Sequence, residues 1–488
     1  MKTKLLLLLA MCIGMTSSAW ALEKDGDVYQ ISSAQDLADF AALVNGGETT
    51  ASAVLTGDID MSTLESWTAI GDWNTGAVSS AYCGHFDGQG FTIKGFNFTS
   101  NKNYFGIFGV VSAGCFVENF SIYGTMTLKH KTGGVVGYTR DTSVIIRDIH
   151  CYLDINSTAD GFRPGGILGS ANNGTTVIEN CSYSGILDAG GHTGNIGGIV
   201  GYANSDTKTI LNITNCLFDG KIQNGTTAEG QCGGIVGYCN KGKVTIKNCL
   251  SIGSITSSEG NVGQFFGRLN TSNSTFASQN YYLGDFVNGT SSGAEATGIA
   301  PVKVTAEQLA SGEIAYALNG NQSENVNWFQ KLGTDTHPTP NGSDIVYMTG
   351  HMHCNGTAYE GETAYSNESS ALKDDHSFSD GFCSYCGSPD EKYMVANTDG
   401  YFEIGTANQL KWFSAYVNQI NPKSNAVLTA DIDLNGVVWT PIGNANNQYT
   451  GIFDGQGHAI TNFSYTATGD NNGLFGYING AIVKNFSI

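Results

Sequence analysis

The sequence is poor in charge and in proline. Charged side chains make up 14% of its 488 residues, and only 7 prolines occur beside 65 glycines. Because 41% of the residues are hydrophobic, the composition excludes a disordered chain, and it does not match a collagen. We therefore expect a folded, glycine-rich, all-β protein.

Basic side chains are also scarce. There are 23 Lys and Arg against 43 Asp and Glu, which gives a formal charge of -20. Such a charge repels nucleic acid and anionic lipid at long range. The basic residues occur singly along the sequence, with no Lys/Arg cluster that could follow phosphates, so we expect no nucleic-acid partner.

Long apolar runs are absent except at the N-terminus. There two lysines precede LLLLLAMCIGM, and small residues lead to an A-x-A site that ends at Ala21. This pattern predicts a signal peptide over residues 1–21, although Cys12 leaves open a lipidated start. No other run approaches the ~20 residues of a membrane helix. We expect a secreted, cell-surface or outer-membrane-associated product without a transmembrane segment.

A glycine-rich hexapeptide, GGIVGY, recurs along most of the chain. A glycine pair before apolar residues and a further glycine predicts a short buried strand that is bent at both ends. Recurrence at a period of about 30 to 35 residues predicts stacked coils. The copies are GGVVGY at Gly133, GGILGS at Gly165, GGIVGY at Gly197 and Gly233, and looser forms at Phe105, Gly263 and Asn472.

A second motif in register with the first ends in asparagine. Asparagine tolerates positive φ, and its amide can stack on the asparagine one coil away, so the motif predicts a strand that ends at a corner. One coil departs from the pattern, with Asp148 and His150 before Cys151. The motif occurs at Asn119, Asn180, Asn215 and Asn248.

Cysteines follow these corners. We expect them to form an inward column of small buried hydrophobic groups, since eleven cysteines after the signal peptide is an odd number for a disulfide framework. The predicted column contains Cys151, Cys181, Cys216 and Cys249.

Two helices are expected beside the coils. Residues 28–45 predict a strand and a helix capped by Ser32 or Ser33, which could close the open end of the stack. Residues 304–319 predict an amphipathic helix that begins at Thr305 with Gln308 three residues later. Between these regions, Asp87-Gly88 is typical of a hairpin turn.

The last ninety residues repeat the start of the chain. AVLTADIDL at Ala426, WTPIG at Trp439 and GIFDGQG at Gly451 match AVLTGDIDM, WTAIG and GHFDGQG nearer the N-terminus. The sequence stops one coil into this second copy, so we expect either a longer protein or a partner that covers the apolar end.

The expected organisation is two parallel β-helix-like repeat solenoids with short capping helices, joined by a small Cys/His module. The expected segments are a signal peptide (1–21), a first β-helix domain (22–300), a helical cap and linker (301–342), the zinc-ribbon-like module (343–390) and the start of a second β-helix domain (391–488).

The GGIVGY repeats, the FDGQG turn and the WTPIG strand resemble the GLUG-motif repeats of bacterial cell-surface and adhesin-like proteins. The resemblance covers about residues 26–335 and 399–488. It implies elongated, parallel β-helix-like surface modules and says little about activity. Similar repeats precede the catalytic domain of immunoglobulin-A-cleaving metallopeptidases, but no His-Glu-x-x-His motif occurs in this sequence.

The residues with the clearest metal-binding pattern are Cys354, His376, Cys383 and Cys386. A Cys-x-x-Cys turn places two thiolates on one metal, and an upstream Cys and His complete a tetrahedral set, which predicts a structural zinc site.

Two alternatives to this zinc site remain. Cys383 could form a disulfide with Cys386 or with Cys354, which an exported protein permits. His351 or His353 could also replace one of the metal ligands.

Other patterns predict structure rather than chemistry. The paired aspartates Asp58 with Asp60 and Asp431 with Asp433 recur at matching places in both copies, which favours a structural role over acid/base catalysis. The string Gly289–Gly293 matches a nucleophile elbow without its strand and helix, and predicts a surface loop. Four aromatic residues are expected in cores rather than as sugar platforms: Trp328, Phe329, Trp412 and Phe413.

The expected function is a non-catalytic adhesion or ligand-binding stalk for a host protein or a glycan. The first alternative is a β-helical polysaccharide lyase or hydrolase, with Asp58 and Asp60, or Asp148 and His150, as acid and base. The second alternative is a structural spacer that presents a domain beyond residue 488.

Overall fold

The structure is a computed structural model. It describes residues 22–73, 80–128, 131–140, 143–161, 163–203, 208–225, 230–257, 261–270, 273–285, 294–348, 353–354, 365–369, 376–465 and 471–488. The chain divides into two compact units, residues 1–347 and 348–488. The predicted signal peptide and the Gly289–Gly293 string lie outside the described residues.

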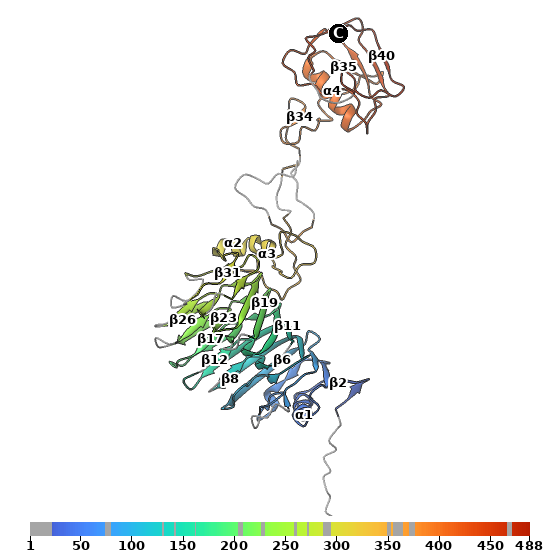
Figure 1. Cartoon of the computed structure of the whole chain (residues 1–488). Coiled ribbons are helices and arrows are strands. Elements are labelled where there is room, and N and C mark those ends of the chain that lie inside the picture. Colours follow the sequence, from blue (N-terminus) through green and yellow to red (C-terminus); the bar gives the residue numbers. More distant parts are fainter. Residues whose placement is uncertain are drawn as a thin grey trace, which may run out of the picture. The chain divides into compact units, whose positions relative to one another are not determined.

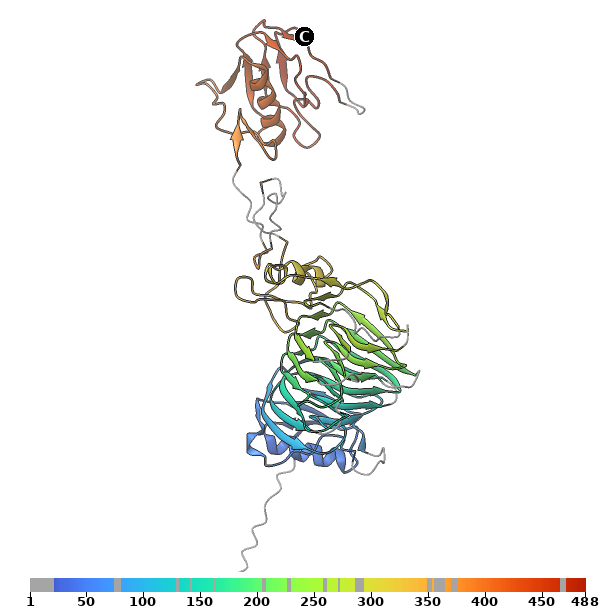
Figure 2. The ribbon, with the colours of Figure 1, turned by 90° about the vertical axis from the view of Figure 1, so that its left-hand side faces the viewer.

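The first unit is a stack of coils whose strands pair in parallel with the same strand of the next coil (Figures 1 and 2). One sheet, the six-stranded sheet, contains β7 (Phe108–Val111), β10 (Val136–Arg140), β13 (Leu168–Asn172), β18 (Val200–Ala203), β23 (Val236–Cys239) and β28 (Phe266–Leu269). The five-stranded sheet beside it contains β9 (Lys131–Gly133), β12 (Arg163–Gly165), β17 (Asn195–Gly197), β22 (Gln231–Gly233) and β27 (Asn261–Gly263).

The third and largest sheet closes each coil. It begins with short strands of the first coils: β1 (Lys24–Asp25), β2 (Val28–Ile31), β3 (Ser52–Leu55), β4 (Ile59–Asp60), β5 (His85–Asp87) and β6 (Thr92–Ser100). Two long strands follow, β8 (Phe116–Leu128) and β11 (Val144–Ser157). The next coil divides the same path into β14 (Gly174–Glu179), β15 (Ser182–Tyr183) and β16 (Ile186–Asp188), and the following ones into β19 (Thr209–Thr214), β20 (Leu217–Phe218), β21 (Lys221–Gly225), β24 (Lys243–Lys247), β25 (Leu250–Ser251) and β26 (Ser254–Ser257).

The sheet ends with β29 (Thr275–Phe276), β30 (Tyr281–Tyr282), β31 (Thr297–Gly298) and β32 (Val302–Lys303). One continuous apolar core runs from the first coil to Tyr282. The predicted all-β, parallel β-helix-like fold is confirmed.

The repeated glycines are required because the next coil passes too close for a side chain. A Cβ atom on Gly198 would lie 2.1 Å from the carbonyl oxygen of Gly234 and 2.3 Å from the ring of Phe218. The glycine pair is therefore a packing device, and its φ angles are not positive.

The corners are formed by the predicted asparagines. Asn180, Asn215 and Asn248 have φ angles of 50 to 51°, and Asp148 takes the same place with φ 53°. The amide of Asn215 donates to Oδ1 of Asn180 at 3.0 Å, and that of Asn180 donates to Asp148 at 2.9 Å. The predicted stacking of corner amides is confirmed for Asn180 and Asn215, but Oδ1 of Asn215 has no hydrogen-bond partner among the described residues, so the ladder ends before Asn248.

The predicted cysteine column is correct for three of its four members. Cys181, Cys216 and Cys249 are buried free thiols, and the N–H of Cys216 lies 3.4 Å from Sγ of Cys249. Cys151 is buried too, but it is in register with Tyr183. Because Asp148 rather than His150 occupies the corner, the prediction placed this coil two residues out of register.

The N-terminal helix closes the first coil as predicted. Helix α1 (Ala34–Asn45) begins after Ser33, whose hydroxyl accepts from the N–H of Asp36, and Leu37 and Phe40 enter the common core.

The predicted helix over residues 304–319 is broken. Thr305 and Gln308 form the expected capping box of α2 (Ala306–Ala310), but Gly312 has φ 92° and starts a separate helix, α3 (Glu313–Leu318). Both helices pack against Leu217 and Leu250, whose side chains point out of the coils. The helices therefore contact the outside of the coils as well as the end of the stack. A short 3₁₀ turn, η1 (Met61–Thr63), lies in the first coils.

The predicted hairpin at Asp87-Gly88 is wrong. Strand β5 pairs in parallel with β3 and β8, whereas β6 pairs with β4 and β8. The turn is a corner within one coil, where the N–H of Gly88 donates to the carbonyl of Glu118 at 2.8 Å.

The second unit begins with a hairpin and then repeats the opening of the first unit. Its elements are β33 (Phe378–Ser379), β34 (Phe382–Cys383), β35 (Tyr401–Ile404), α4 (Ala407–Gln419), β36 (Asn425–Leu428), β37 (Ile432–Asp433), β38 (Ile452–Asp454), β39 (Ile460–Thr461) and β40 (Ile482–Lys484).

The two openings agree in register and in detail. The pairings Ala53 with Phe86 and Ala426 with Phe453 are equivalent. The amide of Asn45 in α1 holds the N–H of Gly71, and Asn418 in α4 holds the N–H of Gly443, at 2.9 and 2.8 Å. The sequence repeat therefore corresponds to a structural repeat.

Candidate metal centre and outer face

The structure brings the four predicted metal ligands together in the second unit. The antiparallel hairpin of β33 and β34 supports the Cys-x-x-Cys turn. That turn closes where the N–H of Gly387 donates to the carbonyl of Cys383 at 2.9 Å, and Gly387 has φ 70°. One ligand atom from each of Cys354, His376, Cys383 and Cys386 lies within 4.8 Å of the others.

Their distances fit a shared metal better than a disulfide. Sγ of Cys354 lies 3.2 Å from Sγ of Cys383, and Sγ of Cys386 lies 3.2 Å from Nδ1 of His376. The three cysteines are free thiols, and a disulfide bond would require about 2.05 Å. In a tetrahedral site with metal-sulfur bonds of about 2.3 Å, neighbouring ligand atoms are separated by about 3.5 to 3.8 Å.

The electrostatics of the group also suit a cation. Burial raises the pKa of Cys383, but hydrogen bonds with the backbone N–H groups of Cys386 and Tyr385 and with the side chains of Cys354 and His376 together lower that pKa to about 5. Burial and the neighbouring thiols raise the pKa of Cys354 to about 12. Ionising all three thiols this close together would create repulsion between them, and a bound divalent cation would remove it.

His353 is not part of this group. Its ring stacks on Tyr385 with centroids 3.8 Å apart. The other predicted substitute ligand, His351, lies outside the described residues.

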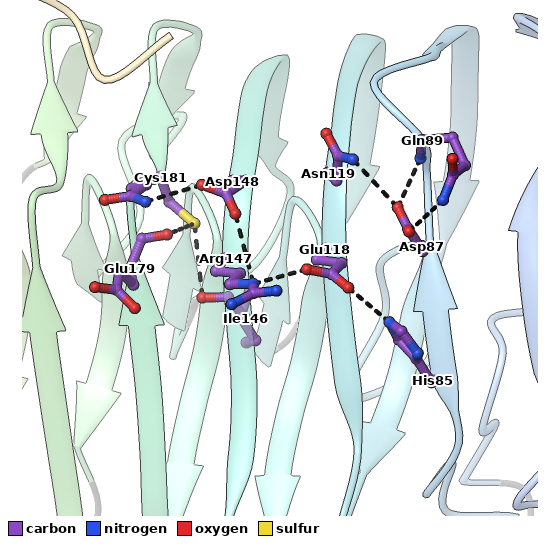
Figure 3. Close-up of polar contacts among 11 residues, drawn as sticks. His85, Asp87, Gln89, Glu118, Asn119, Ile146, Arg147, Asp148, Glu179 and Cys181 are labelled. Atoms are coloured by element: carbon purple, nitrogen blue, oxygen red, sulfur yellow. Dashed lines mark hydrogen bonds and ion pairs between the residues drawn. The ribbon is translucent and has the colours of Figure 1, made fainter. Parts of the chain in front are cut away.

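A second group of charged residues lies on the outer face of the largest sheet of the first unit (Figure 3). Asp87, Glu118, Arg147 and Glu179 occupy the same position on successive coils. Glu118 links two neighbours, since Oε1 lies 2.6 Å from Nε2 of His85 and Oε2 accepts from Nε of Arg147 at 2.7 Å.

Sequence reasoning missed this group. The residues are far apart along the chain, and the only signal is that their separations match the coil period. His85, Asp87 and Glu118 could together approach a metal ion. However, Asp87 accepts from the N–H of Gln89 at 2.7 Å and from the amide of Asn119 at 3.3 Å. Its carboxylate therefore already stabilises the corner of the coil through hydrogen bonds (Figure 3).

The second unit shows which part of this group is structural. Asp454 there accepts from the N–H of Gln456 and the amide of Asn485, as Asp87 does, while Ile452 and Lys484 replace the histidine and the glutamate. The aspartate therefore shapes the corner in both units. The contacts of Glu118 with His85 and Arg147 are an ion-pair ladder specific to the first unit.

The paired aspartates bond to the backbone or to nearby side chains. Asp58 accepts from the N–H of Thr92 at 2.9 Å, and Asp431 accepts from the N–H of Ala459 at 2.9 Å. Asp60 accepts from the hydroxyl and N–H of Ser62, which lowers its pKa.

Asp433 completes the set. It accepts from the amide of Asn462 at 2.8 Å and from the N–H of Asn435, and its pKa is lowered in turn. Carboxylates with lowered pKa values are poor general acids.

The pair Asp148 and His150 does not form an acid/base unit either. Asp148 belongs to the corner ladder, and Arg147 lies 3.5 Å from it. The buried ring of His150 bonds to the hydroxyl of Ser182 at 2.9 Å, and burial lowers its pKa to about 4.

The aromatic residues behave largely as predicted. Trp328, Trp412 and Phe413 are fully buried, whereas Phe329 is half-buried.

Comparisons with known proteins add one likeness. No known protein family matches the chain, and no curated protein matches it significantly. A solved structure from Bacteroides ovatus, provisionally described as an immunoglobulin A1 protease, is 23% identical, with a TM-score of 0.49, and the match covers 65% of this chain and 93% of that chain. No functional residue is carried over from it.

Proposed function

We propose that this chain is a non-catalytic, exported surface protein whose first unit acts as an adhesion or ligand-binding β-helical stalk for a host protein or a glycan. It resembles the GLUG-repeat surface proteins, and its N-terminal sequence has the pattern of an export signal. Within the described residues, no helix is long and apolar enough to cross a bilayer.

One observation carries the non-catalytic part of this proposal: the candidate acid/base residues have structural partners. Asp58 and Asp431 bind the backbone at equivalent places in the two units, and His150 is buried against Ser182. What the stack offers to a partner is its outer surface, where side chains repeat in register from coil to coil.

We also propose that Cys354, His376, Cys383 and Cys386 bind a structural zinc ion. Four protein ligands leave no position for water or substrate, so the ion would stabilise the fold of the second unit without taking part in a reaction.

The test uses the full chain, purified after removal of the predicted signal peptide. We expect binding to glycan arrays or to immobilised host matrix proteins above background, and no cleavage of any polysaccharide tested. Depolymerisation that is lost in Asp148→Asn or Asp58→Asn would show that the chain is an enzyme. Absence of any binding partner would refute the ligand-binding role.

A further inference from the structure

Three of the four arginines of this acidic chain lie over aromatic rings around the six-stranded sheet of the first unit. We call this surface the tyrosine face. It contains Trp73, Tyr104, Tyr138, Tyr202 and Tyr238 together with Lys131, Arg140, Arg163 and Arg268.

The repeat itself builds this face. Tyr138, Tyr202 and Tyr238 are the last residues of the GGxxGY motifs and occupy one column of the sheet. Ala203 and Cys239, the residues that follow two of them, point into the core, so strand alternation turns the tyrosines outward.

One coil has serine in this column, and the same coil carries an arginine. Ser170 stands between Tyr138 and Tyr202. In the same coil, the guanidinium of Arg163 lies 4.4 Å from the ring centroid of Tyr202.

Two arginines enclose a pair of tyrosines. The rings of Tyr202 and Tyr238 are 5.5 Å apart, and Arg268, in register with Tyr238, lies 5.5 Å from that ring. Stacking on a ring fixes the plane of a guanidinium and leaves its edge available for a carboxylate or sulfate.

A second cationic group lies towards the N-terminus. Lys131 lies 5.5 Å from the ring of Tyr104, and that ring is 4.4 Å from the ring of Tyr138. Arg140 lies over Trp73. The tyrosine face therefore gathers cations from the coils of β10, β13 and β28, although the basic residues occur singly along the sequence.

Lys131, Arg163 and Arg268 differ from the cations of this chain that are paired with carboxylates. Lys102, Arg147 and Lys303 form ion pairs with carboxylates. In the described part of the chain, no Asp or Glu forms an ion pair with Lys131, Arg163 or Arg268.

Lys131 and Arg163 also face each other on adjacent strands. Burial and the charge of Arg163 lower the pKa of Lys131, so like charges are held together here. A bound anion would relieve this repulsion.

Amide side chains flank the arginines and tyrosines. The amide of Asn270 donates to the hydroxyl of Tyr238 at 2.5 Å and to Asn240 at 3.0 Å, and its Oδ1 accepts from Nε of Arg268 at 2.9 Å. Amides, tyrosine hydroxyls and planar cations together suit a ligand with hydroxyl groups and spaced anionic groups.

We propose that the tyrosine face binds an acidic polysaccharide, with Arg163 and Arg268 contacting its carboxylate or sulfate groups. This proposal rests on the ligand-binding function proposed above and names the ligand class. Successive coils are about 4.8 Å apart, so the two-coil step from Tyr138 to Tyr202 is about 10 Å, the length of roughly two sugar rings. Arg163 and Arg268 belong to coils three steps apart, about 14 Å, so a polymer with an anionic group on alternate rings can place one group near each of the two arginines.

A nucleic acid fits this face less well. It carries a phosphate on every nucleotide, and its affinity depends on neutralising many phosphates, whereas this face offers only a few cations in a protein of charge -20. An acidic polysaccharide with one charge per two rings is repelled less and can use the amides and hydroxyls as well.

The experiment measures binding of the full chain by affinity electrophoresis and calorimetry. The probes are hyaluronan, which carries one carboxylate on alternate rings, kappa-carrageenan, which carries one sulfate on alternate rings, neutral dextran and oligo(dT). We expect at least one acidic polysaccharide to bind, dextran not to bind, and added salt to weaken binding. Preference between the two acidic probes identifies carboxylate or sulfate as the recognised group.

The variants are Arg163→Gln, Arg268→Gln and the double variant, with Arg147→Gln as the matched control. Arg147 also lies over a ring, Phe116, at 4.6 Å, but it is paired with Glu118. Each substitution on the tyrosine face should weaken binding about tenfold or more, since hydrogen bonds to charged groups contribute that much. Arg147→Gln should bind like the parent chain.

Arg163→Lys keeps the charge without the planar fork and should recover only part of the affinity; it also serves if Arg163→Gln fails to fold. If the chain binds a glycan or a host protein elsewhere and the double variant binds equally well, this proposal is wrong while the ligand-binding function stands. Equal weakening by Arg147→Gln, or tighter binding of oligo(dT), would also overturn it. Absence of any binding would refute both proposals.

Discussion

Replacing Asn215 tests whether the corner ladder stabilises the coil stack. Asn215 has φ 51° and is buried, and its amide donates to Asn180 at 3.0 Å. Alanine loses the hydrogen bond and must also adopt a left-handed backbone. Glycine loses the same hydrogen bond but adopts this backbone freely.

The glycine variant should therefore be more stable than the alanine variant, which is the reverse of their usual order. Loss of the hydrogen bond costs about 1 kcal/mol, and the left-handed conformation costs alanine about 1 to 2 kcal/mol more. Glycine instead loses about 0.4 to 1 kcal/mol through the entropy of the unfolded chain. We expect Asn215→Ala to destabilise by about 2 to 3 kcal/mol, and Asn215→Gly to be more stable than Asn215→Ala by about 0.5 to 1 kcal/mol.

The assay is urea unfolding of the full chain combined with hydrogen exchange. Exchange is needed because coils of a repeat protein can open separately. The informative amides are those of Asn215 and Leu217, which donate to Lys247 and Cys181. Faster exchange should be centred on these coils.

A control position should show the ordinary order of the two residues. Ala42 is exposed in the interior of α1, where the parent alanine is expected to be more stable than Ala42→Gly by about 1 kcal/mol. If alanine is at least as stable as glycine at Asn215 too, the left-handed corner does not set the stability and the reasoning fails.

The remaining predictions concern the metal group, His150 and Glu118. Metal analysis should find one zinc ion per chain, lost with Cys383→Ser; zinc-free reduced protein would refute the site. His150 has an unfolded pKa of about 6.5 and a folded pKa of about 4, so protonation favours unfolding. Stability should fall as pH drops from 6.5 to 4, by up to about 3 kcal/mol, and His150→Gln should remove this part in urea unfolding at several pH values. Glu118→Gln removes the charge that faces His85 and Arg147 and should cost about 1 kcal/mol in the same assay, with the exposed Glu65→Gln unchanged as control.

The coil architecture was predictable because its repeating signals each have one physical cause. Asparagine at the corners reflects positive φ, as at Asn180 and Asn215, and glycine pairs reflect close approach of the next coil, as at Gly198. The metal group was predictable because the Cys-x-x-Cys spacing itself sets the geometry. These inferences needed no knowledge of distant contacts.

The errors arose where one residue type has two causes. Aspartate at Asp148 performs the corner role of asparagine, so the coil was aligned on His150 and Cys151 was misplaced. Asp87-Gly88 forms a coil corner with the composition of a hairpin turn. The prediction of a single helix over residues 304–319 gave too little weight to Gly312, which separates two helices.

The surface groups could not be found by reading along the chain. Lys131 and Arg163 are distant along the chain and are neighbours only because they occupy equivalent positions on adjacent coils. The same holds for Asp87, Glu118 and Arg147. Once the period is known, such columns can be extracted by writing the sequence one coil per row.

The in-register parallel stacking has a consequence for how this protein can evolve. Because each coil meets its neighbours through the same register on both sides, duplication or deletion of one whole coil changes the length of the stack and leaves the remaining contacts of the same kind. An insertion of a single residue within a strand would instead turn every later side chain of that strand to the opposite face. Related proteins should therefore differ in length by whole coils, and each coil should keep its own outward-facing side chains.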